Sequence, residues 1–97
     1  QADDIITAGN GNNGITAGAG NDTITVGNGN NTIGATSGNN TITAGNGINV
    51  ITTGNGADVI TVGTGYNLIT AGAGADTITF GANAAGVKNG DLVELVK

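Results

Sequence analysis

The sequence predicts an all-β protein, a parallel β-solenoid with 18 residues in each coil and two facing parallel sheets. Isoleucine recurs every nine residues without a slip, and glycine recurs at two fixed positions between the isoleucines. A short, fixed period of this kind is typical of solenoids, in which each repeat stacks on its neighbours. The 97 residues also include one Tyr, one Phe, no Trp and no Met, which is too little bulk for an ordinary globular core.

Each nonapeptide is predicted to form one strand and one turn. Ile and Thr favour extended backbone, and alternation along the strand places Ile24 and Val26 inward and Thr23 and Thr25 outward. Two nonapeptides close one coil, so the nine repeats predict about four and a half coils. Equivalent side chains then form ladders. One sheet carries Ile6, Ile24, Ile42, Ile60 and Ile78, and the facing sheet carries Ile15, Ile33, Ile51 and Ile69.

The composition limits the function. The net charge is −5 with only two lysines, so there is no basic face for nucleic acid or for anionic membranes. No segment is long and apolar enough to insert into a membrane. The chain has no His and no Cys, and a roll this thin offers no pocket, so we expect no enzymatic activity. Disorder is the alternative for a chain rich in glycine, but the strict period argues against it.

The repeat covers most of the chain and decays near its end. We assign residues 1–86 to the solenoid and residues 87–97 to a C-terminal cap or docking strand. Phe80 and the apolar run from Leu92 to Val96 could fold back as a lid. The same run could instead pair with the first coil of another molecule, because an open strand edge is a template for pairing. The sequence thus favours self-association along the solenoid axis.

The Asp and Asn residues of the turns separate by coil side. One side carries Asp4, Asp22, Asn40, Asp58 and Asp76, and the other carries Asn13, Asn31, Asn49 and Asn67. Stacked carboxylates near 5 Å apart repel by about 3 kcal/mol per pair at an effective dielectric of 20. Bound Ca²⁺ would offset this repulsion, since it prefers carboxylate and carbonyl oxygens. A solvated row of aspartates without metal is the alternative.

The best repeats have the pattern Ala-Gly-Ala-Gly-Asn-Asp-Thr-Ile-Thr, as in residues 17–25, with close matches at residues 53–61 and 71–79. This motif resembles the repeats-in-toxin nonapeptide, the hemolysin-type calcium-binding repeat G-G-x-G-x-D-x-U-x, in which U is a large apolar residue. The resemblance implies a calcium-bound β-roll of the kind found in secreted bacterial proteins. It assigns metal binding to Asp4, Asp22, Asp58 and Asp76.

The chain departs from that motif at two places. The leading glycine of the G-G-x-G motif, which would precede the two glycines that recur in this chain, is replaced throughout by Ala, Val, Thr or Phe. The aspartate is replaced by asparagine on one whole side. We therefore expect the asparagine side to bind no metal. We also expect Asn40, which follows Thr36 and Ser37 in place of the usual turn residues, to be the weakest link of the acidic side.

Threonine dominates the outward positions of one sheet, where it is expected at Thr7, Thr23, Thr25, Thr41, Thr43, Thr61, Thr77 and Thr79. This array resembles the ice-binding face of β-solenoid antifreeze proteins, although threonine is also common on any solvated strand. The sequence thus favours a non-catalytic module at the cell surface or outside the cell. It predicts a calcium-stabilised scaffold of a filament, adhesin or surface layer, with ice binding as the alternative.

Overall fold

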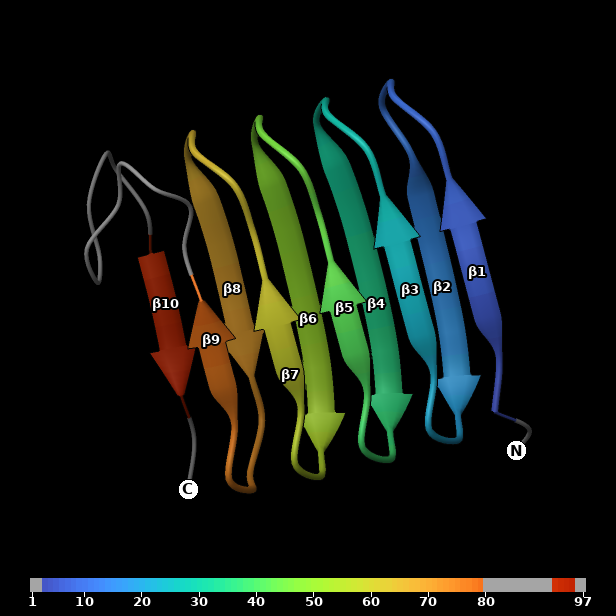
Figure 1. Ribbon diagram of the computed structural model, residues 1–97. Coiled ribbons are helices and arrows are strands. Elements are labelled where there is room, and N and C mark those ends of the chain that lie inside the picture. The colour runs from blue at the N-terminus through green and yellow to red at the C-terminus, as the bar shows by residue number, and fades with distance from the viewer. Residues whose placement is uncertain (1–2, 80–91, 96–97) are drawn as a thin grey trace.

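The computed structural model describes residues 3–79 and 92–95 and consists of two parallel sheets of five strands each (Figure 1). The first sheet contains β1 (Ile5–Ala8), β3 (Thr23–Val26), β5 (Thr41–Thr43), β7 (Val59–Thr61) and β9 (Thr77–Thr79). The second sheet contains β2 (Gly14–Ala19), β4 (Asn31–Ser37), β6 (Asn49–Asn55), β8 (Asn67–Ala71) and β10 (Leu92–Leu95).

The chain alternates between the two sheets, and every pair of neighbouring strands is parallel. In the repeat, each residue pairs with the residue 18 positions later, as Ile6 does with Ile24 and Ile15 with Ile33. The predicted parallel β-solenoid with 18 residues per coil is therefore confirmed. Within the described part of the chain, no helix has the length and apolar character needed to cross a membrane.

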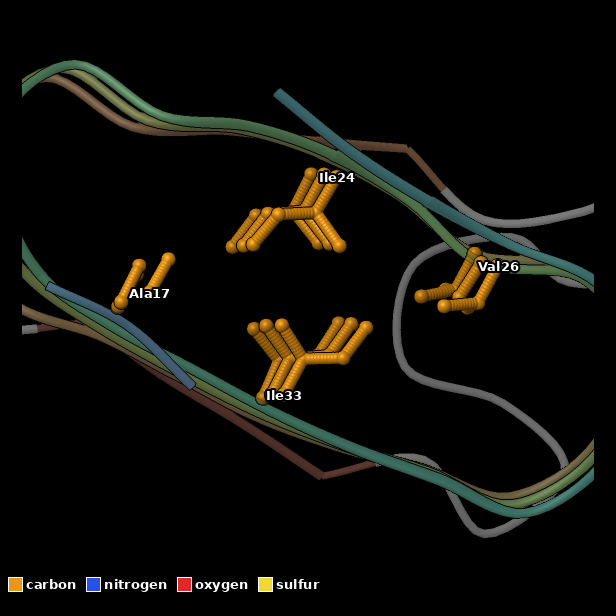
Figure 2. Packing of buried hydrophobic residues seen from close by; sticks show 12 residues of the cluster. Ala17, Ile24, Val26 and Ile33 are labelled. Carbon is orange, nitrogen blue, oxygen red and sulfur yellow. The ribbon is translucent and has the colours of Figure 1, made fainter. Parts of the chain in front are cut away.

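The core is a thin layer of stacked isoleucines between the sheets. Ile24 from the first sheet and Ile33 from the second point toward one another, and Ala17 and Val26 lie to either side of them (Figure 2). The isoleucines of the inner coils are completely buried or nearly so. Because identical side chains stack at each coil, a single nonapeptide pattern fills the whole interior, which is why the period was readable from the sequence.

The two glycine positions of each repeat serve different purposes. The second glycine has a positive φ in every described turn, for example 130° at Gly29, which side-chain-bearing residues rarely adopt. The first glycine has no such requirement, but at Gly27 a Cβ would collide with the side chain of Asn10 in the neighbouring coil. Positive φ thus accounts for glycine at one of the two positions, and close coil stacking accounts for it at the other.

Residues Leu92–Leu95 form β10, which extends the second sheet beyond β8. Leu92 pairs with Leu68 and Val93 with Ile69, so this strand aligns Val93 with the isoleucine ladder even though it lies outside the repeat. The lid expected at Phe80 cannot be described, because residues 80–91 and 96–97 lie outside the described part of the chain.

Candidate metal centre

The turns form two rows along the sides of the solenoid. We call the row that holds residues 4, 22, 40, 58 and 76 the acidic edge, and the row that holds residues 13, 31, 49 and 67 the neutral edge. In Figure 1 the neutral edge runs along the top and the acidic edge along the bottom. The sequence-based separation of aspartate from asparagine is therefore a separation between two sides of the molecule.

The side chains of the acidic edge point along the stack of turns. The backbone N–H of Asp4 donates to Oδ1 of Asp22 over 2.9 Å, and Asp58 donates in the same way to Oδ1 of Asp76. Asn40 joins the two halves, because it accepts from the N–H of Asp22 and donates its own N–H to Asp58, again over 2.9 Å. One oxygen of each stacked side chain therefore fixes the spacing between coils.

The other carboxylate oxygen is different. Oδ2 of Asp22 and Oδ2 of Asp58 are buried and have no hydrogen-bond partner in the described structure. The two residues are only 1% and 0% exposed, respectively, whereas Asp4 is exposed and Asp76 is half-buried. An ionised carboxylate in such a place is costly unless a cation or a hydrogen-bond donor compensates it. These orphaned oxygens fit calcium, which takes carboxylate oxygens as ligands.

Burial raises the pKa of Asp58, and the negative charge of Asp76 adds to that shift. The backbone N–H of Asn40, the hydroxyl of Thr53 and the Asn40 amide lower the pKa but do not cancel the effect of burial. A carboxyl that resists ionisation in the metal-free protein is one whose charge lacks a counterion. A divalent cation would supply that counterion.

Thr53 is a candidate site residue that the sequence did not reveal. It faces inward from β6 and is 4% exposed, and within residues 3–79 its hydroxyl has no partner with hydrogen-bond geometry. It nevertheless lowers the pKa of Asp58. The equivalent positions hold alanine at Ala17, Ala35 and Ala71, so the hydroxyl is a departure from the repeat. In the sequence, this replacement of alanine by threonine five residues before Asp58 was the one sign that Thr53 could belong to the site.

The neutral edge shares only part of this hydrogen-bond pattern. The N–H of Asn13 donates to Oδ1 of Asn31 over 3.2 Å, as on the acidic edge, but the N–H groups of Asn31 and Asn49 donate to the backbone carbonyls of Ile48 and Tyr66. The side-chain amides of Asn13, Asn31 and Asn49 each donate to Oδ1 of the next asparagine, at 2.8 to 3.0 Å. The asparagine amides thus form a row of hydrogen bonds along the stack.

Asn40, which the sequence predicts to be the weakest link of the acidic side, is fully hydrogen-bonded through its amide group. It is 0% exposed, and its amide donates to the Gly38 carbonyl at 3.2 Å and to Asp58 Oδ1 at 3.1 Å. It interrupts the row of negative charges without interrupting the row of hydrogen bonds. The reason is that its Oδ1 accepts the N–H of Asp22 as a carboxylate oxygen would, and its amide adds a donor that an aspartate lacks.

The structure brings all four predicted ligands, Asp4, Asp22, Asp58 and Asp76, to one edge, with Asn40 in the middle. Among the described residues, no group of three acidic side chains is arranged to hold a metal ion. A calcium ion on this edge therefore needs oxygens of other kinds, and the carbonyls of the glycine-rich turns are the nearest source by sequence.

The eight predicted threonines lie on the outward face of the first sheet. Thr7, Thr25, Thr43, Thr61 and Thr79 align in one row, and Thr23, Thr41 and Thr77 share a second row with Ile5 and Val59. All eight are exposed except Thr61, which is half-buried.

A model of the RTX calcium-binding nonapeptide repeat, which spans four copies of the motif, matches residues 1–33, 34–68 and 52–84. The chain belongs to this family. Comparisons with curated proteins and with solved structures gave no significant match. Membership identifies calcium as the cofactor of an RTX repeat module and the β-roll as a structural motif. It agrees with the orphaned carboxylate oxygens of the acidic edge.

Proposed function

We propose that this RTX module is a non-catalytic extracellular scaffold whose solenoid is stabilised by calcium bound at Asp4, Asp22, Asp58 and Asp76. The observation that carries the proposal is the pair of buried, unpartnered oxygens at Asp22 and Asp58. A fold that buries uncompensated carboxylates is unstable near neutral pH until a cation binds them. Calcium binding is then coupled to folding, because the unfolded chain does not assemble the ligands.

An extracellular or cell-surface location suits sites of this composition. Few carboxylates converge at any one point of the acidic edge, and calcium affinity falls as the number of charged ligands falls. Weak sites of this kind fill at the calcium concentrations outside cells and remain empty at those inside. The module would thus gain its full stability after export, and it would then stack along its axis as a segment of a filament, adhesin or surface layer.

The calcium-dependence is tested by thermal unfolding, followed by circular dichroism, together with calorimetric titration. At about 100-fold excess over Kd, calcium is expected to raise the melting temperature by roughly 10–20 °C relative to chelator. Magnesium should have a smaller effect, because it demands a tighter octahedral shell. A variant with all four aspartates replaced by asparagine is the matched control, and its melting should not respond to calcium. A wild-type protein that takes up no calcium and melts equally in chelator would contradict the proposal.

Ice binding is a second candidate function. It is favoured by two aligned rows on the first sheet, one entirely of threonine and one of threonine with Ile5 and Val59, which repeat at the coil spacing of about 4.8 Å. Replacement of exposed Thr41 by tyrosine should abolish the shaping of growing ice crystals and leave the circular dichroism spectrum unchanged. The control is Thr52→Tyr on the second sheet, which should leave ice shaping intact. Wild-type protein that does not shape ice at high concentration would exclude this function.

A further inference from the structure

Asparagine and aspartate can be compared atom by atom on the acidic edge, because Asn40 lies in one stack with the aspartates. On this edge, Oδ1 of each stacked Asp or Asn accepts the backbone N–H of the residue 18 positions earlier. On the neutral edge Oδ1 of Asn31 accepts in the same way, whereas the N–H groups of Asn31 and Asn49 donate to backbone carbonyls. The two residue types then differ only in the remaining side-chain atom, which is Nδ2 in asparagine and Oδ2 in aspartate. The two edges are distinguished by whether that second atom has a hydrogen-bond partner.

In the asparagines, the second atom lies among oxygens of its own turn. Nδ2 of Asn13 is 2.8 Å from the Gly9 carbonyl and 3.3 Å from the Gly11 carbonyl. Nδ2 of Asn31 is 3.2 Å and 3.3 Å from the equivalent carbonyls of Gly27 and Gly29. The next asparagine contributes a third oxygen at about the same distance. The amide nitrogen thus sits where several oxygens converge and donates hydrogen bonds to them.

In the aspartates, an oxygen takes the place of that nitrogen. Oδ2 has no hydrogen to donate when the carboxylate is ionised, and at Asp22 and Asp58 it has no hydrogen-bond partner among the described residues. The same turn that satisfies an asparagine therefore leaves an aspartate oxygen facing a region that favours positive charge. Either a cation supplies this charge or the site remains unfavourable.

We propose that the side-chain amide of each inward asparagine replaces a calcium ion, and that Asn40 therefore divides the acidic edge into two separate calcium sites. One site is built on Asp4 and Asp22, and the other on Asp58 and Asp76. The neutral edge takes no calcium because its amides already occupy the cation positions. This inference rests on the proposed calcium function, but it concerns which turns bind the ion and how many sites exist.

Two observations support separate sites in addition to the framework. Asn40 donates its amide to the Gly38 carbonyl and to Oδ1 of Asp58, so the turn between the two pairs is already satisfied. The unpartnered oxygens occur on both sides of Asn40, one in each pair. The buried hydroxyl of Thr53 precedes Asp58, whereas alanine holds the equivalent positions Ala17 and Ala71 before Asp22 and Asp76, so the two sites should differ in affinity.

The test uses the full chain at neutral pH, with bound calcium counted by equilibrium dialysis and melting followed in chelator. Asp58→Asn should lose one bound ion, keep the other with a Kd within about threefold of its wild-type value, and melt at a higher temperature without metal. Asn40→Asp should bind more calcium than the wild type, because it joins the two sites. Its metal-free form should melt lower by about 5 °C or more.

The neutral edge provides the complementary test. The double variant Asn31→Asp/Asn49→Asp recreates an acidic pair, so it should melt lower than the wild type in chelator, recover in calcium and bind an additional ion. The matched control is Asn28→Asp/Asn46→Asp, which adds the same charge on the same edge at exposed positions that accept backbone N–H groups. That control should bind no additional tightly held ion.

The possible failures are distinct. A wild type that binds no calcium contradicts the proposed function, and the metal-free melts of Asp58→Asn and Asn40→Asp still test the role of the amide. A wild type that binds calcium, with both ions lost in Asp58→Asn, overturns the division into two sites. An Asn31→Asp/Asn49→Asp variant that melts lower equally with and without calcium overturns the replacement of calcium by the amide.

Discussion

At the residue scale, a single atom decides how each turn is satisfied. Asparagine and aspartate have the same shape and accept the same backbone N–H, yet only asparagine can also donate to the turn carbonyls. The separation of the two residues between the edges was visible in the sequence. The direction of each hydrogen bond was not, because it depends on which way the side chain leans along the stack, and periodicity does not encode that direction.

The raised pKa of Asp58 leads to a pH prediction for the metal-free protein. The folded state holds the Asp58 proton more tightly than the unfolded chain does, whose ordinary value is 3.8. The stability that comes from this proton is fully present below the unfolded pKa and is lost as pH rises through the folded pKa. The metal-free melting temperature should therefore rise as pH falls from 7 toward 4.

Melting of calcium-free wild type and of Asp58→Asn across this pH range measures the effect. The variant lacks the titrating group, so its melting temperature should rise less, and the difference isolates Asp58 from the other carboxylates. In saturating calcium the wild-type trend should reverse, because the ion needs the deprotonated carboxylate. Identical pH profiles for the two metal-free proteins would show that Asp58 ionises freely in the folded state.

A second prediction at this scale concerns the left-handed turn position. Gly29→Ala places a Cβ at a φ of 130° and against the Gly11 carbonyl of the neighbouring coil. The backbone strain alone should cost about 1–3 kcal/mol in the free energy of unfolding, measured with urea. Gly34→Ala is the control, since it has open space around the added Cβ and should change stability by no more than about 1 kcal/mol. Equal losses in both variants would argue against a special role for φ.

At the element scale, each strand is defined by its place in the stack more than by its own sequence. The isoleucine period identified the strands, their alternation and their register, because β-strand side chains alternate strictly between the two faces. The period did not reveal that the second-sheet strands β4 and β6 have seven residues each while β5 and β7 have three.

The difference in strand length follows from the turns. In three of the four neutral-edge turns, an asparagine follows the first glycine, and Oδ1 of Asn10 and Oδ1 of Asn28 accept N–H groups of the next coil. Those side-chain bonds replace strand pairing early in the turn. On the acidic edge, β4 continues to Ser37, which pairs with Asn55 of β6. The register of β10 was also beyond prediction, because Leu92 pairs with Leu68 at a spacing of 24 residues, outside the 18-residue period.

We expect a substitution in the middle of the isoleucine ladder to lower the free energy of unfolding strongly. Ile42 lies on β5, is completely buried, and aligns with Ile24 and Ile60 of the adjacent coils. Ile42→Ala should therefore lower the free energy of unfolding by about 2–5 kcal/mol, since the neighbouring coils cannot close the cavity without breaking their own register. Thr43→Ala on the exposed face of the same strand should change it by about 0.5 kcal/mol or less. Urea unfolding of both variants in calcium makes the comparison, and similar losses would mean that the isoleucine ladder does not dominate the core.

At the scale of the whole molecule, the described coils form a stack with a strand edge at each end. In the described part of the chain, the first sheet ends at β1 and β9, and the second sheet ends at β2 and β10. A terminal strand of a parallel sheet has backbone groups on one side that another strand can pair with. In both sheets the strands follow one another from the first coil to the last, so the last strands of one molecule can pair with the first strands of the next. Such a head-to-tail contact does not close on itself and therefore propagates.

The resulting prediction is association along the axis, which depends on the edge strands. Sedimentation velocity of the wild type in calcium should show an average mass that increases with concentration. Thr16 is exposed on the terminal strand β2, and a lysine there should reduce association, because charged side chains on an edge strand oppose pairing with a second sheet. Calcium should favour association in the wild type, since it reduces the net charge of −5 that makes the molecules repel one another.

The position of the lysine separates an edge effect from a general effect of charge. Thr52 lies in the same row of the second sheet as Thr16, but on the central strand β6. Thr52→Lys therefore adds the same charge to the same face without touching an edge. If stacking occurs through strand pairing, Thr16→Lys should sediment as a monomer while Thr52→Lys associates like the wild type, and both should keep the wild-type melting temperature within a few degrees. A wild type that remains monomeric at every concentration, with and without calcium, would remove the assembly proposal and leave the calcium sites unaffected.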